Sequence, residues 1–289
     1  MANKSRFFIA QASIKTFFKQ GYKKTYNITQ LSEILEQNKV LWNLPVSLTV
    51  NKFADKLLNS KILFKQEIVF EGNLISNKER FTVEDVSIFQ LAVSLVNKSY
   101  LSHYSAVFLH GLTTQIPKTI YISVEQSKKN VVRNELKQEA IDIAFSKPQR
   151  KSNTTSLHDG YTFLVHNGMY ANRSGVYTLG DLSITNIERT LIDIAVRPNY
   201  AGGVFSVLDV YRNAIDKISI NKLIAILDKL NFIYPYHQTI GFYLERAGYD
   251  LKKLEVLRQR PMLNNFYLTY EMLDKEYDSS WKLYYPKGM

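Results

Sequence analysis

The stretch LPVSLTVNKFADKLLNSKIL, residues 44–63, decides the fold predicted for the first part of the chain. Pro45 breaks the chain, and Ser47 is a residue type that caps helices. Apolar residues then recur at helical spacing and would face a core: Val50, Phe53, Ala54, Leu57 and Leu58. Polar residues occupy the other side: Thr49, Lys52, Asp55, Lys56 and Asn59. The stretch therefore predicts an amphipathic helix that keeps lysine and asparagine side chains in solvent.

Two further helices are expected before this stretch and a β-hairpin after it. Apolar residues at helical spacing predict a first helix from Phe7 to Phe18 that ends at Gly21, and Asn27 or Thr29 would begin the second. The β-like runs 64–70 and 80–83 flank a turn-rich joint at 71–79, which predicts a loop or hairpin tip. Three helices followed by a hairpin are the order of a winged helix-turn-helix, so residues 1–83 are expected to form such a domain.

The side chains of this predicted domain favour DNA as its ligand. In a winged helix the third helix enters the major groove and the wing lies along the sugar-phosphate backbone. We therefore expect DNA contacts from Asn51, Lys52, Lys56 and Lys61 on and near the third helix, and from Lys65, Lys78 and Arg80 on the wing.

The charge of the chain agrees with a nucleic-acid partner, and its composition excludes several kinds of site and structure. The formal net charge is +11, and residues 1–83 carry 13 lysines and arginines against 6 aspartates and glutamates. Such a concentrated positive field attracts polyanions. Zero cysteines exclude a disulfide framework, a cysteine zinc site and a thiol nucleophile. No apolar run is long enough to span a bilayer and no targeting segment is evident, so a cytoplasmic protein without a membrane partner is expected.

The rest of the chain, residues 84–289, predicts a larger mixed α/β domain. Helices are expected over 86–96, from Ser102 to Gly111 and over 131–145, strands over 119–124 and 161–166, and a loop over 146–160. Beyond residue 186 the pattern is nearly all helical, so 204–289 is expected to be a mostly helical extension. The fold class is therefore α+β, with a small sheet partly covered by helices.

The sequence offers little evidence that the protein is an enzyme. The phosphate-binding patterns GxxxxGK[ST] and GxGxxG are absent, as is the GxSxG elbow of a serine nucleophile. His103 and His110 lack a carboxylate at metal-ligand spacing, so core or helix-end histidines are expected there. Glu135-Leu136-Lys137 resembles a nuclease motif but falls in a predicted helix. We expect no catalytic residue, no metal and no cofactor.

SITNIERTLIDIAVRP, residues 183–198, sets several charges among apolar residues. Thr185 and Glu188 have the spacing of a capping box, which predicts a loss of about 1 kcal/mol in Glu188→Ala. Arg189, Asp193 and Arg197 follow one another at helical steps on the face expected to be exposed. The charges are thus interpreted as structural, with Arg189 and Arg197 able to face a partner.

Two segments resemble the AbiEi antitoxin family of bacterial type IV toxin–antitoxin (abortive infection) systems. They are SHYSAVFLHGLTTQIPKTIYISV, residues 102–124, and ITNIERTLIDIAVRP, residues 184–198, so the resemblance covers roughly residues 100 to 200. It implies a DNA-binding transcriptional autorepressor that recognises inverted repeats in its own promoter. It also implies that the C-terminal domain counteracts an AbiEii-like nucleotidyltransferase toxin, with or without a direct complex.

The chain departs from this family in its C-terminal extension. A basic cluster there consists of Arg246, Lys252, Lys253, Arg258 and Arg260. The cluster would be a second nucleic-acid contact or antitoxin surface, or simply a solvated face.

Two other functions remain open from the sequence. One is a protein-interaction module whose winged helix does not bind DNA. The other is a nucleic-acid-processing enzyme with an unrecognised site. The first predicts a stoichiometric complex and indifference to promoter DNA; the second predicts metal- or nucleotide-dependent turnover.

Overall fold

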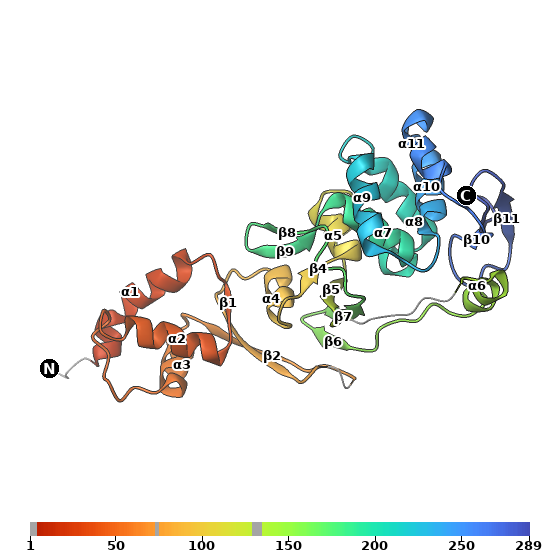
Figure 1. Cartoon of the computed structure of the whole chain (residues 1–289). Helices are drawn as coiled ribbons and strands as arrows, with labels where there is room; N and C mark the ends of the chain where they lie inside the picture. The colour runs from red at the N-terminus through yellow and green to blue at the C-terminus, as the bar shows by residue number, and fades with distance from the viewer. Residues whose placement is uncertain (1–4, 73–74, 129–134) are drawn as a thin grey trace.

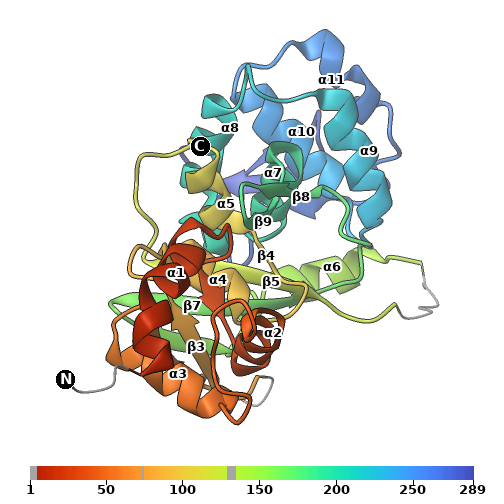
Figure 2. The ribbon, with the colours of Figure 1, turned by 90° about the vertical axis from the view of Figure 1, so that its left-hand side faces the viewer.

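The computed structural model describes residues 5–72, 75–128 and 135–289, and it has the mixed α+β class expected from the sequence (Figure 1). Helices α1 to α3 lie at one end of the molecule and helices α8 to α11 at the other, with the largest sheet between them (Figure 2).

The N-terminal end contains three helices and a three-stranded antiparallel sheet. The elements, in chain order, are α1 (Arg6–Gln20), β1 (Thr25–Tyr26), α2 (Ile28–Asn38), α3 (Val50–Asn59), β2 (Phe64–Ile68) and β3 (Lys78–Thr82). The strands lie in the order β1-β3-β2. Asn27 begins α2 with a capping box. Its side chain accepts a hydrogen bond from the Gln30 N–H, and the Gln30 side chain accepts one from the Asn27 N–H.

A separate hydrophobic core holds this end together. Helix α3 buries Phe53, Ala54 and Leu57, as its spacing predicts. The ring of Phe53 stacks on Trp42 at 6.0 Å and meets the edge of Phe7 at 6.3 Å. The N-cap of α3 is Thr49 and not the expected Ser47. The apolar face of α3 is therefore fixed inward and its polar face is turned to solvent.

The central sheet has six strands in the order β6-β7-β5-β4-β9-β8. They are β4 (Tyr100–Leu101), β5 (Thr119–Glu125), β6 (Thr155–His158), β7 (Tyr161–Gly168), β8 (Val176–Leu179) and β9 (Leu182–Thr185). The pairs β5–β7 and β4–β9 are parallel, and the other three pairs, including the middle pair β5–β4, are antiparallel. Helix α4 (Ile88–Ser94) shares a core with this sheet, in which Leu91 lies with Ile120 and Phe163.

A third core, the largest of the three, is mainly helical. It joins α5 (His103–Leu109), α6 (Gln138–Phe145), α7 (Ile187–Val196), the 3-10 turn η1 (Pro198–Ala201), α8 (Val204–Asn213), α9 (Ile220–Leu230), α10 (Tyr236–Arg246) and α11 (Leu251–Arg258). Helix α7 contacts α5, α8, α9 and α10. The segment 184–198 is therefore central to the larger part of the molecule.

The chain ends in a sheet where helix was expected. Strands β10 (Phe266–Tyr267), β11 (Lys275–Asp278) and β12 (Leu283–Pro286) form a small sheet in the order β10-β12-β11. The prediction of a mostly helical extension is thus wrong beyond Arg258. The aromatic residues of this segment prefer a sheet surface, and fully buried Trp281 packs against Gly241 of α10.

Two smaller predictions also need correction. The expected loop 146–160 contains β6, which forms a hairpin with β7. The expected helix 131–145 begins only at Gln138, and its residues 131–134 lie outside the described residues. Residues 73 and 74 of the expected hairpin tip also lie outside them. Within the described ranges, no helix is long and apolar enough to cross a membrane.

Candidate functional site

The outer face of α3 carries the predicted DNA-contacting residues that remain free. Asn51 and Lys52 are exposed on the helix, and Lys61 is exposed just after it. Lys56 is half-buried, with its ammonium 5.6 Å from the ring centre of Phe7. None of these three lysines forms an ion pair with a described residue. Their charges are available to an anionic ligand.

The hairpin β2–β3 offers fewer free cations than the sequence predicts. The Lys65 ammonium lies 2.7 Å from carboxylate oxygens of both Glu67 and Glu79, and these hydrogen bonds raise the pKa of Lys65. Lys78 is half-buried, and its ammonium donates to the Ser76 hydroxyl. Lys65 therefore brings no net positive charge to the hairpin, while Lys78 does.

Arg80 does not face solvent, so its predicted contact with a DNA backbone is wrong. The side chain is buried and donates to the carbonyl oxygens of Glu79, Ser94 and Leu95, at 2.6 to 3.3 Å. Burial lowers the pKa of its guanidinium. The physical reason is that α4 ends against β3, and its last carbonyls need a donor. Arg80 thus ties the N-terminal sheet to α4.

Two of the five residues in the C-terminal basic cluster pair with carboxylates of the protein. Arg258 pairs with Glu245 at 2.8 Å, and Arg260 forms a bidentate pair with Asp228 at 2.7 and 3.0 Å. Arg246 donates to the Met289 carbonyl and lies over the rings of Phe242 and Tyr285. Arg246 is nevertheless exposed, as are Lys252 and Lys253 on α11.

The charges of α7 are buried, contrary to the sequence prediction. Arg189 and Asp193 form an ion pair at 2.7 Å with less than a tenth of either residue exposed. Arg189 also donates to the Ser174 carbonyl. The loop before β8 lies directly over the helix, because Gly175 has a φ of +76° and a Cβ there would stand 2.6 Å from the Arg189 Cβ.

The capping box predicted at Thr185 and Glu188 is also absent. Asn186 is the N-cap of α7 and accepts from the Arg189 N–H. The Glu188 carboxylate is buried, accepts from the Ser219 N–H at 3.3 Å and pairs with the Lys222 ammonium at 3.0 Å. Glu188 therefore links α7 to the N-terminus of α9 instead of capping its own helix.

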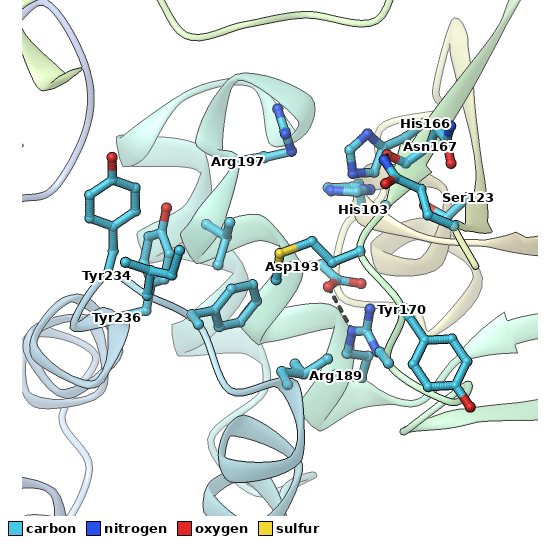
Figure 3. Close-up of a pocket in the computed structure, with 18 of the residues that line it drawn as sticks. His103, Ser123, His166, Asn167, Tyr170, Arg189, Asp193, Arg197, Tyr234 and Tyr236 are labelled. Carbon is cyan, nitrogen blue, oxygen red and sulfur yellow. Dashed lines mark hydrogen bonds and ion pairs between the residues drawn. The ribbon is translucent and has the colours of Figure 1, made fainter. Parts of the chain in front are cut away.

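A cavity of about 390 Å³ lies beside Arg189 and Asp193 (Figure 3). His103, Ser123, His166 and Asn167 lie on one side of it, and Tyr234 and Tyr236 on the opposite side. Asp193 and Arg197, both from the end of α7, lie between the two sides. The cavity thus collects side chains from α5, β5, β7, α7 and the segment that joins α9 to α10.

A chain of hydrogen bonds fixes the polar side. The buried His103 has a φ of +50°, which costs free energy for a side chain of this size, and its Nδ1 lies 2.8 Å from the Ser102 hydroxyl. That hydroxyl lies 2.7 Å from the hydroxyl of Ser123. Whichever ring nitrogen of His103 carries the proton, Ser123 keeps hydrogen-bonding capacity toward the cavity.

The imidazoles beside the cavity are uncharged at neutral pH. His103 and His166 meet edge to face at 5.6 Å. Burial lowers the pKa of both, to about 3 for His166, and the positive charge of Arg197 adds to the effect. Burial also raises the pKa of Asp193 against the opposing pull of Arg189. The described residues contain no cluster of three or more histidines, aspartates or glutamates that could hold a metal ion.

The sequence did not predict this cavity, although His103 and His110 are the core and helix-end histidines that it led us to expect. His110 hydrogen-bonds the Thr185 carbonyl at 2.7 Å and stacks on Tyr177. The partner of His103 is His166, on a strand that becomes its neighbour only through the β5–β7 pairing. The residues of this cavity that the sequence did single out are the charges of one helical segment: Arg189, Asp193 and Arg197.

Comparison with known proteins gives a fold and no family. No family model matches the chain, and no curated protein matches it. The chain is similar to the crystal structure of the RV2827C protein from Mycobacterium tuberculosis, with a TM-score of 0.58 and 13% identity over 96% of this chain and 90% of that chain. At this identity the likeness concerns the fold alone, and it extends over nearly the whole length of both chains.

Proposed function

We propose that the chain is a DNA-binding transcriptional autorepressor whose N-terminal end is a winged helix-turn-helix. The order α1-β1-α2-α3-β2-β3, with β3 between β1 and β2, is the order of that fold. The observation that carries the proposal is the outer face of α3, where Asn51 and Lys52 are exposed and the nearby Lys56 and Lys61 lack a carboxylate partner.

The distribution of free charge supports a contact made mostly by α3 and little by the wing. Lys65 is neutralised by two glutamates and Arg80 is buried, so Lys78 is the remaining wing cation among the predicted contacts. A long amphipathic face with an asparagine and lysines suits the major groove, where amides read base edges and ammonium groups contact phosphates. We therefore expect binding that depends on α3 and on salt.

We further propose that the chain is the antitoxin of a type IV toxin–antitoxin system, counteracting a nucleotidyltransferase toxin. Support comes from the resemblance of residues 102–124 and 184–198 to the AbiEi family. These segments include α5 and α7, which share the mainly helical core, and β5, and all three elements line the cavity. The antitoxin surface is then expected on the larger part of the molecule, away from α3.

The DNA proposal is tested by titrating the protein against the DNA upstream of its own gene. We expect Lys52→Ala combined with Lys56→Ala to weaken binding by about tenfold or more, since two phosphate contacts are lost. The matched control is Lys147→Ala combined with Lys151→Ala, which removes the same charge from an exposed loop of the larger part. Equal affinities of the two double variants for promoter DNA would exclude α3 as the contact.

Co-expression with a neighbouring nucleotidyltransferase gene tests the antitoxin proposal. We expect the α3 double variant to protect growth as well as the unaltered protein does, since the two activities lie at opposite ends of the molecule. A protein that binds the toxin stoichiometrically but ignores promoter DNA would instead be an interaction module.

A further inference from the structure

We propose that the cavity beside α7 binds a nucleoside 5′-monophosphate. Its volume of about 390 Å³ falls within the range of about 300 to 1,000 Å³ that is usual for small-molecule sites. Three different chemical groups face it, and each fits one part of such a ligand. The proposal concerns the larger part of the molecule and does not depend on DNA binding by α3.

Arg197 fits the phosphate. Its guanidinium donates to one protein atom, the Arg150 carbonyl oxygen, at 2.9 Å, and lies over the ring of Tyr200. No carboxylate among the described residues pairs with it, in contrast to Arg189, which Asp193 neutralises. The neighbouring His103 and His166 are uncharged at neutral pH, because burial lowers their pKa. A half-buried guanidinium without a counter-charge favours an anion, and it binds phosphate oxygens through two parallel hydrogen bonds.

Asp193 fits the sugar hydroxyls. One carboxylate oxygen, Oδ1, accepts from Arg189, while Oδ2 accepts no hydrogen bond from a described residue. The residue is more than nine-tenths buried and lines the cavity. A buried carboxylate oxygen needs a donor, and the hydroxyls of a ribose are donors.

The tyrosine side fits the base. Tyr234 and Tyr236 lie across the cavity from Ser123 and Asn167 (Figure 3). Phe232 also lines the cavity, with its ring centre 5.1 Å from that of Tyr236. Aromatic faces stack on any base, and amide and hydroxyl groups bond the edge of a base ring. Ser123 is held ready for this by its hydrogen bond to Ser102.

Calorimetric titration of the full chain with AMP, GMP, CMP and UMP tests the proposal. We expect at least one to bind, and to bind at least about tenfold more tightly than its nucleoside, than its 2′,3′-dideoxy analogue and than inorganic phosphate. Equal affinity for nucleotide and nucleoside, or for the dideoxy analogue, would overturn the assignment of Arg197 or of Asp193 respectively. Failure of all four to bind at millimolar concentration would overturn the proposal.

Two variants locate the binding. Arg197→Gln should remove the advantage of the nucleotide over its nucleoside while leaving nucleoside affinity within about twofold. Arg212→Gln on α8, an exposed arginine outside the cavity, is the matched control and should bind the nucleotide unchanged. The Lys52→Ala and Lys56→Ala double variant should also bind the nucleotide unchanged, even where it no longer binds promoter DNA. If that double variant loses nucleotide binding, the ligand lies on α3 and the cavity proposal is wrong.

Discussion

At the scale of single residues, the charged side chains buried within α7 are the most distinctive feature of the chain. Glu188, Arg189 and Asp193 lie within one helix, and all three are less than a tenth exposed. Each has a partner: Glu188 bonds the start of α9, and Arg189 bonds Asp193 and a loop carbonyl. Burying a charge is costly without such partners, so these contacts fix the relative positions of α7, α9 and the loop before β8.

Glu188→Ala is expected to lower the free energy of unfolding by about 1 to 3 kcal/mol. The loss arises because the Ser219 N–H and the Lys222 ammonium lose their acceptor at the start of α9. Chemical denaturation measures it, with Glu188→Gln as the control that keeps an acceptor oxygen. A loss in the alanine variant no larger than that of the glutamine variant would contradict the role given to the carboxylate.

The buried histidines give the stability of the protein a pH dependence with a defined sign. Because the pKa of His166 is lowered to about 3 in the folded protein, the unfolded chain binds more protons below about pH 6.5. Its contribution is therefore complete above that pH and is lost as the pH falls toward 3, by up to about 1.4 kcal/mol per unit.

His166→Gln should reduce the slope of stability against pH between about pH 6 and 4. Denaturant titrations of both proteins across this range measure the difference. The same slope in both would mean that His166 is not held neutral by its surroundings.

At the scale of elements, the sequence predicted best where one amphipathic helix faces one core. Helix α3 buries Phe53, Ala54 and Leu57 as its spacing indicates, and Asn27, one of the two expected N-caps, begins α2. Prediction failed where a second layer covers a polar face. Arg189 and Asp193 follow one another at the spacing of an exposed pair, yet the loop at Gly175 covers them. The spacing of residues along one helix carries no information about a loop that returns over it.

The C-terminal sheet could not be predicted from local spacing either. Its strands are short, and the residue on which Trp281 packs is distant in the sequence. Trp281 fits onto α10 only because position 241 is glycine: a Cβ there would lie 2.1 Å from the indole ring. The candidate cavity could not be predicted either, since its residues come from segments that are far apart in the sequence and meet only in the folded chain.

Gly241→Ala is therefore expected to destabilise the protein by about 1 to 3 kcal/mol, the cost of overpacking a filled core. The melting temperature should fall by several degrees, with a change in the fluorescence of Trp281. Gly168→Ala is the control, because a Cβ at that glycine meets its neighbours at ordinary contact distances of 3.6 Å or more. An unchanged melting temperature in Gly241→Ala would contradict the packing of Trp281 on α10.

At the scale of the whole molecule, the proposed DNA-contacting face and the cavity lie in different parts of the chain, and Arg80 connects the first part to the second. Its guanidinium holds the end of α4, which packs on the central sheet, while its own strand belongs to the N-terminal sheet. The proposed regulator would thus present its basic helix at one end and keep its buried polar site within the larger part (Figures 1 and 2).

The most direct measurement of the central claim is the affinity for promoter DNA as a function of salt concentration. If Lys52 and Lys56 contact phosphates, the double alanine variant should lose affinity, and its slope of log affinity against log salt should be smaller by about 2 than that of the unaltered protein. The Lys147→Ala and Lys151→Ala control should keep the slope of the unaltered protein. Identical slopes for both double variants would contradict DNA recognition by α3.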